Sequence, residues 1–129
     1  MVVARSSKDL FDYIPVADRD QPKEKQTTFH LRPFPTHLQL RAQRLVEEDK
    51  GHMAEVVVRA GIANWTNFVD AGGKVVECKH EKGVVSVHGV EVRDPLTLES
   101  MDWISQTLCT ELAVAIWTGN TLTDDDVKN

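Results

Sequence analysis

The strongest constraint on this chain is a single apolar stripe near its C-terminal end. The segment from residue 95 to residue 119 reads PLTLESMDWISQTLCTELAVAIWTG. Its apolar residues recur at intervals of three and four, which places them on one face of a helix: Met101, Ile104, Leu108, Leu112 and either Ala115 or Ile116. A helix of about 20 residues is about 30 Å long and cannot bury such a stripe by itself. The rest of the chain must therefore supply a surface that covers it.

Both ends of this helix carry recognisable signals. Thr97 stands at an N-cap position, and Asp94 is an alternative cap one turn earlier. Gly119 stands where a helix commonly closes in the left-handed conformation. These signals predict one amphipathic helix over residues 97–118.

Residues 65–93 are the predicted cover for this helix. Their sequence, WTNFVDAGGKVVECKHEKGVVSVHGVEVR, alternates short runs of valine with turn residues. Such alternation is typical of a small antiparallel meander, with turns here at 70–73, 80–83 and 88–89. Short strands need a helix packed on one face, so we expect three or four strands under the 97–118 helix.

One strand and two helices are predicted before the meander. Residues 27–32 alternate between apolar and polar side chains, which predicts a half-buried strand that could join the sheet. Residues 36–48 have helical spacing after an N-cap threonine. Residues 53–60 have helical spacing again, with Gly61 at the C-cap position. The β-branched run at 56–58 is equally compatible with a strand.

Together these patterns predict an α+β fold, in which a small antiparallel β-meander packs against a long C-terminal amphipathic helix, with one or two N-terminal helices. At 129 residues the chain is long enough for one domain. We expect an extended N-terminal arm over 1–26, a single α+β domain over 27–118 and an acidic C-terminal tail over 119–129. The predicted core consists of ten side chains: Leu38, Leu45, Val57, Trp65, Phe68, Val76, Val85, Ile104, Leu108 and Leu112.

The composition narrows the class of protein. The apolar fraction is 41% and the charged fraction 27%, and no apolar run approaches the length of a membrane span, so we expect a soluble protein. The first residues have no apolar core of signal-peptide length, so we predict no secretion by that route. Two cysteines without a CxxC motif fit a reducing cytoplasm.

The net charge of −5 argues against a general nucleic-acid binder, because contacts to phosphates need a surplus of Lys and Arg on one face. A regulatory protein that binds nucleic acid would need one continuous basic face built from Arg41, Arg44, Lys50 and Arg59. This class stays open as an alternative, and a steep salt dependence of binding to DNA would support it.

No sequence motif predicts a chemical reaction. Residues 70–74 lack the spacing of a phosphate-binding loop, and Cys78, His80 and His88 match no common zinc spacing. The three aspartates at 124–126 lack the pattern of a calcium loop. Neither GxSxG nor HExxH occurs, and a Ser–His–Asp set can be tested only in a structure. We therefore predict no catalytic residue, no cofactor and no metal.

Aromatic and apolar residues outside the expected core are candidates for partner binding. The arm carries an apolar cluster within a polar segment, so it is either a flexible terminus or an arm that docks on a neighbouring subunit. Trp103 and Trp117 lie nearly four helical turns apart, so they either widen the core face or form a partner-facing ridge. The predicted partner-binding residues are Leu10, Phe11, Tyr13, Ile14, Trp103 and Trp117.

Three stretches of the sequence resemble phage proteins. NWTNFVDAGGKVV at 64–76 and ELAVAIWTGNTLTDDDVKN at 111–129 resemble small proteins encoded in the structural gene blocks of tailed bacteriophages. There, a Trp-x-Asn-Phe-x-Asp-x-x-Gly hairpin is followed by a helix ending in Asn-x-Leu-Thr and a terminal Lys-Asn. The stretch TTFHLRPFPTHLQL at 27–40 is similar to the opening of phage tail-assembly accessory proteins. The resemblance implies a part in virion construction and implies no catalytic residues.

The function predicted from this resemblance is that of a non-enzymatic structural or assembly protein of a tailed bacteriophage. It would act through protein–protein contacts in the virion, as a minor tail, head–tail or capsid accessory component. Its expected partners are other phage structural proteins or copies of itself, in the virion or in the host cytoplasm during assembly. Two alternatives stay open: a tail assembly chaperone that is absent from the finished particle, and a small regulatory binding protein.

Overall fold

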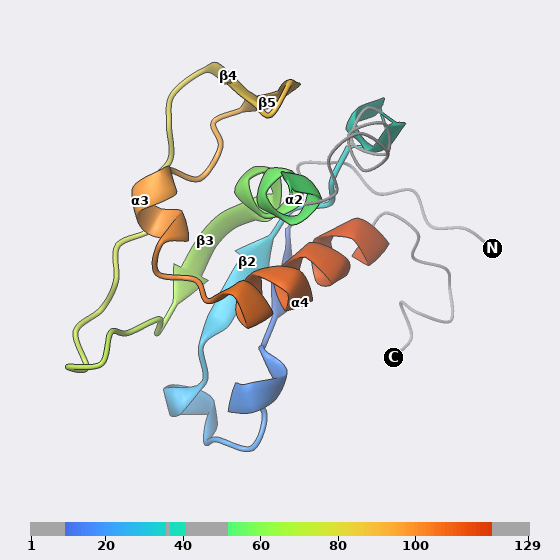
Figure 1. The fold of residues 1–129 in the computed structure, drawn as a ribbon. Helices are drawn as coiled ribbons and strands as arrows, with labels where there is room; N and C mark the ends of the chain where they lie inside the picture. Colours follow the sequence, from blue (N-terminus) through green and yellow to red (C-terminus); the bar gives the residue numbers. More distant parts are fainter. Residues whose placement is uncertain (1–9, 36, 41–51, 120–129) are drawn as a thin grey trace.

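Two helices lie on one face of a three-stranded antiparallel sheet, and a separate β-hairpin stands beside them (Figure 1). The computed structural model of the protein describes residues 10–35, 37–40 and 52–119. The predicted α+β class is confirmed, with antiparallel strands and a C-terminal helix packed against them.

The sheet has the strand order β1-β2-β3, and both pairings are antiparallel. Its strands are β1 (Phe11–Tyr13), β2 (Thr28–Leu31) and β3 (Ile62–Thr66). Phe29 and Leu31 alternate with half-buried polar residues and are themselves fully buried, so the strand predicted at 27–32 is confirmed. The register shifts between His30, which is paired with Asn64, and Leu31, which is paired with Ile62.

The described part of the predicted arm belongs to the domain. Strand β1 pairs with β2, and Phe11 and Tyr13 pack against the core of their own chain. The Tyr13 hydroxyl donates to the Glu111 carboxylate at 2.6 Å, and the backbone N–H of Val16 donates to the same oxygen at 2.9 Å. Two 3-10 turns, Val16–Asp18 and Lys23–Lys25, then return the chain to β2. The predicted boundary at residue 27 is therefore wrong, and residues 1–9 lie outside the described part.

Helix α2 (Met53–Gly61) settles the ambiguity of its valine run in favour of a helix. Its three consecutive valines, residues 56–58, are all buried, because α2 lies between α4, the sheet and the hairpin. Tertiary burial on several sides outweighs the weak preference of β-branched residues for strands. None of the helices in the described part of the chain combines the length and the apolar character that crossing a membrane requires.

The prediction of one helix over 97–118 is wrong, because the chain forms two. A single turn, α3 (Leu98–Met101), is followed after four residues by α4 (Gln106–Thr118). The side chain of Thr97 caps α3 by accepting from Ser100 N at 3.1 Å, so the predicted cap is correct. Ser105 then caps α4 by accepting from Leu108 N at 3.2 Å. The apolar spacing continues across the break because Ile104, in the connecting turn, is buried in the same core.

The segment predicted as one meander, 65–93, contains strands of two different sheets. Strands β4 (Val84–Val87) and β5 (Val90–Arg93) pair only with each other in the described structure. Their turn has His88 at φ 47° and Gly89 at φ 85°, the positive values that a two-residue hairpin turn requires. In the described residues between β3 and β4 the chain makes only isolated bridges, Val69 with Val75 and His80 with Leu96.

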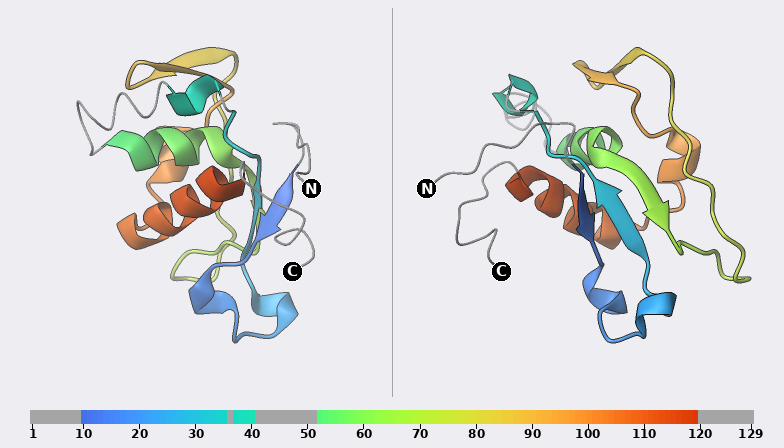
Figure 2. Two further views of the ribbon diagram at one scale, coloured as in Figure 1. Left: turned by 90° about the vertical axis from the view of Figure 1, so that its right-hand side faces the viewer. Right: turned by 180° about the vertical axis from the view of Figure 1, so that it is seen from behind.

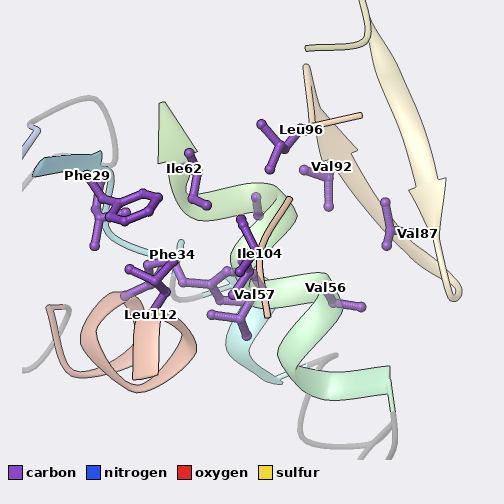
Figure 3. Packing of buried hydrophobic residues seen from close by; sticks show 14 of the residues in the cluster. Phe29, Phe34, Val56, Val57, Ile62, Val87, Val92, Leu96, Ile104 and Leu112 are labelled. Carbon is purple, nitrogen blue, oxygen red and sulfur yellow. The ribbon is translucent and has the colours of Figure 1, made fainter. Parts of the chain in front are cut away.

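Most of the predicted core is buried (Figure 3). Six of the expected side chains are buried: Leu38, Val57, Trp65, Val76, Ile104 and Leu112. Phe68 and Leu108 are partly buried against this cluster, and Val85 lies outside it. Leu45 lies outside the described residues, as does most of the helix predicted at 36–48, of which residues 37–40 are described and helical.

At two positions a glycine is required because a Cβ would collide with a neighbouring side chain. A Cβ at Gly61 would lie 2.5–2.7 Å from three side-chain carbons of Ile116 on α4. A Cβ at Gly119 would lie 2.9 Å from the ring of Phe11. The backbone of Gly119 is helical, with φ −57° and ψ −22°, so the predicted left-handed closure is wrong. These two glycines let α4 approach both α2 and β1.

We expect Gly61→Ala to destabilise the protein by about 1–3 kcal/mol, because the added methyl group overpacks against Ile116. In an ordinary helix the same change would be stabilising. Urea unfolding of Gly61→Ala, Ile116→Ala and the double variant measures the coupling, and the Gly61 change should cost less when Ile116 is truncated.

Gly72→Ala is the matched control for this experiment. A Cβ there meets only Asp70 Oδ1, at 3.4 Å, so the change should stay within about 0.5 kcal/mol. Strictly additive effects of Gly61→Ala and Ile116→Ala would contradict a direct steric contact between α2 and α4.

The Tyr13 hydroxyl provides a second test of how β1 is held. Burial, the hydrogen bond to Glu111 and the charge of Glu111 raise the pKa of Tyr13 from 10.0 to about 12. The folded pKa exceeds the unfolded one, so this group contributes stability that is present below about pH 10 and is lost as the pH rises through about 12.

The chain has one tyrosine, so ultraviolet absorbance reports its ionisation directly. We expect a midpoint near pH 12 in the folded protein and near pH 10 in denaturant. Glu111→Gln should lower the folded midpoint, whereas Glu99→Gln, a change at a distant exposed carboxylate, should leave it unchanged. A folded midpoint equal to that of the denatured chain would show that β1 is not held by this contact.

Candidate interaction surface

The two tryptophans predicted to share a helix face lie in different places. Trp117 is partly buried on α4, and its ring stacks on Phe34 with centroids 5.7 Å apart. Trp103 lies in the turn between α3 and α4 and is 50% exposed. Because the predicted helix is broken between them, the two tryptophans do not act together: Trp117 packs against the core, as the first alternative had it, and Trp103 is open to solvent.

The apolar residues of the arm also divide into two groups. Phe11 and Tyr13 face the core of their own chain, and Ile14 is half-buried beside them. Leu10 is exposed at the start of the described segment. Within the described structure, Phe11 and Tyr13 therefore have a packing role.

Trp103 stands beside an open hollow of about 220 Å³. The hollow is lined by Asp70, Lys74, Val75, Val76, Glu77, Lys79, Glu99, Ser100 and Trp103. Two of these side chains present apolar surface to solvent, since Trp103 is 50% and Val75 68% exposed. We call this hollow and its lining residues the Trp103 surface.

One wall of the Trp103 surface is a tight turn. Asp70 Oδ1 accepts from the backbone N–H groups of Gly72 at 2.9 Å and Lys74 at 3.0 Å. Gly73 has φ 82°, which a residue with a side chain adopts only at a cost. Val69 and Val75 pair across this turn, so the predicted hairpin turn at 70–73 is confirmed, and Val75 lines the same hollow as Trp103.

The floor of the hollow is held by buried hydrogen bonds. Ser100 is 1% exposed; its hydroxyl accepts from Lys79 N at 2.9 Å and donates to Glu77 O at 3.3 Å. The indole N–H of Trp65 donates to Val76 O at 2.8 Å. These bonds tie the 76–79 segment to α3 and to β3, so the surface around Trp103 is preformed.

The rim of the hollow is charged. Lys79 Nζ lies 3.3 Å from a Glu99 oxygen and 3.8 Å from a Glu77 oxygen. An apolar centre inside a polar rim is the usual anatomy of a protein–protein contact site, and here one tryptophan and one exposed valine lie among charged residues.

A second hollow, of about 350 Å³, lies between α2 and α4. It is lined by Met53, Ala54, Val57, Thr110, Ala113, Val114, Trp117 and Thr118. Its lining is mostly apolar, but Trp117 there is fixed by its stacking on Phe34. This groove lacks the charged rim that the Trp103 surface has.

The cysteine and the two histidines that the sequence analysis considered as zinc ligands have local structural roles. His80 Nε2 lies 2.8 Å from Ile62 O, and His88 pairs with Glu55. Burial raises the pKa of the Cys78 thiol to about 11, so this cysteine is not a thiolate at neutral pH. Among the described residues, no three His, Cys, Asp or Glu side chains converge to hold a metal ion.

Arg59 does not contribute to a basic face. It is buried, and its guanidinium donates to Glu81 at 2.6 Å and to Leu96 O at 2.8 Å. The other three residues of the hypothetical face, Arg41, Arg44 and Lys50, lie outside the described structure.

Of the residues that line the Trp103 surface, the sequence analysis named only Trp103 as a candidate for partner binding, and it missed the exposed Val75. Val75 and Val76 are adjacent in an extended segment, so their side chains must point to opposite sides. With Val76 in the predicted core, Val75 had to face outward. This alternation was the available signal.

Comparison of the chain with protein-family models, with characterised proteins and with solved structures finds no match. A functional assignment therefore depends on the chain's own surfaces and on the resemblance of its sequence motifs.

Proposed function

We propose that this protein is a non-enzymatic structural or assembly protein of a tailed bacteriophage, and that the Trp103 surface binds its partner. The observation that carries the proposal is the half-exposed Trp103 beside Val75, on a floor fixed by Ser100. Tryptophan on a preformed surface is the side chain most often found to anchor protein contacts.

The phage assignment rests on the resemblance of a sequence motif that also forms part of the Trp103 surface. The Trp-x-Asn-Phe-x-Asp-x-x-Gly pattern runs from Trp65 to Gly73. Its tryptophan bonds the floor of the hollow, and its aspartate and glycine form the turn at one wall. The segment that resembles phage proteins thus contributes to the candidate contact site.

The proposal and its two alternatives predict that the protein is found in different places during phage assembly. A structural component would be found in finished virions, bound to other phage structural proteins or to copies of itself. A tail assembly chaperone would bind tail protein in the host cytoplasm and be missing from particles. A small regulatory binding protein would be absent from both particles and assembly intermediates.

Mass spectrometry of purified particles tests the proposal. We expect the wild-type protein at a fixed stoichiometry to the major tail and capsid proteins. Its presence only in assembly intermediates would favour the chaperone, and its absence from both would contradict the proposal.

Variants of the contact site test the role of the Trp103 surface. Trp103→Ala should weaken partner binding by about 30-fold, the effect of losing an anchor worth about 2 kcal/mol. Val75→Ser should weaken it less. Val84→Ser is the matched control, because Val84 is a similarly exposed valine on the separate hairpin β4–β5.

Circular dichroism and urea unfolding should show that Trp103→Ala remains folded, since the side chain lies outside the core cluster. Incorporation of Trp103→Ala into particles at the wild-type level would exclude this surface as the contact site.

A further inference from the structure

The face of the sheet that points away from α2 and α4 carries a row of polar side chains. In Figure 2 both helices lie on one side of the strands, and the view from behind shows the strands in front of α4. Asp12 on β1, His30 on β2 and Thr66 on β3 are joined across this outer face. Each of the three strands contributes one member.

The distances in this row are those of good hydrogen bonds. His30 Nδ1 lies 2.7 Å from Asp12 Oδ1, and His30 Nε2 lies 2.7 Å from Thr66 Oγ1. The sheet register places Asp12 directly opposite His30. Asn64 is opposite His30 on the other side, and Thr66 is two residues further along β3, so all four side chains share one face.

A histidine held between a carboxylate and a hydroxyl is an arrangement with known chemical consequences. When Asp12 accepts a hydrogen bond from Nδ1–H, the lone pair of the neutral ring is on Nε2, which can accept the Thr66 proton. A hydroxyl next to a base that is oriented by a third group is the signature of an activated nucleophile.

We propose that Thr66 is a nucleophilic residue that accepts an acyl group from an activated ester, with His30 as its base and Asp12 as the positioning residue. This activity goes beyond the proposed contact function and does not involve the Trp103 surface.

The chemical step balances within these residues. Thr66 Oγ forms a bond to the ester carbonyl carbon while its proton moves to His30 Nε2. The alcohol then leaves as its bond to that carbon breaks, and it takes the proton from His30 Nε2. The product is an acyl ester on Thr66, and His30 is neutral again.

The outer face is open, and this limits the expected rate. Neither of the two hollows described above includes Asp12, His30 or Thr66, so we expect the site to bind the rest of an ester weakly. We therefore expect slow acylation that accumulates on Thr66, with little turnover.

The experiment uses the full chain and p-nitrophenyl acetate as the probe. Intact-mass measurement and peptide mapping should find one acetyl group, on Thr66, and release of nitrophenol should follow the same time course. Thr66→Val should abolish this acetylation, and Thr66→Ser, which keeps a hydroxyl, should retain it. His30→Gln should slow it by about 100-fold or more.

Two matched variants serve as controls. Thr28 lies directly opposite Thr66 in the sheet register, and His37 is an exposed histidine in the described residues. Thr28→Val and His37→Gln should acetylate at the wild-type rate. Wild-type protein in denaturant should lose selective labelling of Thr66.

The role of Asp12 needs a readout that a structural contact would not change. Asp12→Asn should slow acetylation of Thr66, because an amide can donate to Nδ1 and so favour the His30 tautomer whose Nε2 already carries the proton. Asp12→Glu, which keeps a carboxylate, should restore the rate in part. Acetylation of Asp12→Asn at the wild-type rate would remove Asp12 from the mechanism. Acetylation spread over lysines, or equal rates in wild type and Thr66→Val, would overturn the proposal, and neither result bears on partner binding by Trp103.

Discussion

The structure depends on the close approach of α4 to α2. Ile116 is fully buried against the bare backbone of Gly61, where any side chain would collide. This approach brings the inner face of α4 over the sheet, where Leu112 and Phe29 belong to the same buried cluster. At the C-terminal end of α4, Gly119 leaves room for the ring of Phe11 in the same way. One helix thus joins α2 to the N-terminal strand, and the absence of a side chain at two positions makes both contacts possible.

The Trp103 surface results from the path that the chain takes from the hairpin β4–β5 back to α4. Arg59 on α2 holds the backbone at Leu96 and the side chain of Glu81, which fixes both ends of the hairpin relative to the helix. Ser100 then bonds the 77–79 segment to α3. With the backbone fixed on both sides, the turn that follows α3 buries Ile104 and leaves its neighbour Trp103 in solvent. The geometry of this turn therefore both buries Ile104 and exposes Trp103.

The two faces of the sheet have different chemistry. The inner face is apolar and is covered by α2 and α4, whereas the outer face bears hydrogen-bonded polar groups. The alternation of side chains along each strand separates them. The contact site around Trp103 and the row through His30 are built from different elements. Neither site therefore requires a change in the other, so the proposed partner binding and the proposed acylation can be tested separately in one domain.

Local signals in the sequence determined the features that depend on neighbouring residues. Strand β2, helix α2, the Thr97 cap and the turn at 70–73 follow from alternation, helical spacing and turn chemistry, which act over a few residues. Apolar spacing alone did not reveal the break between α3 and α4, because Ile104 is buried on either interpretation. Only the tertiary structure decided that β1 joins the sheet, that β4 and β5 pair apart from β3, and that Asp12 and Thr66 meet His30 from 18 and 36 residues away. Pairing between distant segments depends on how the whole core packs, and no short stretch of sequence contains that information.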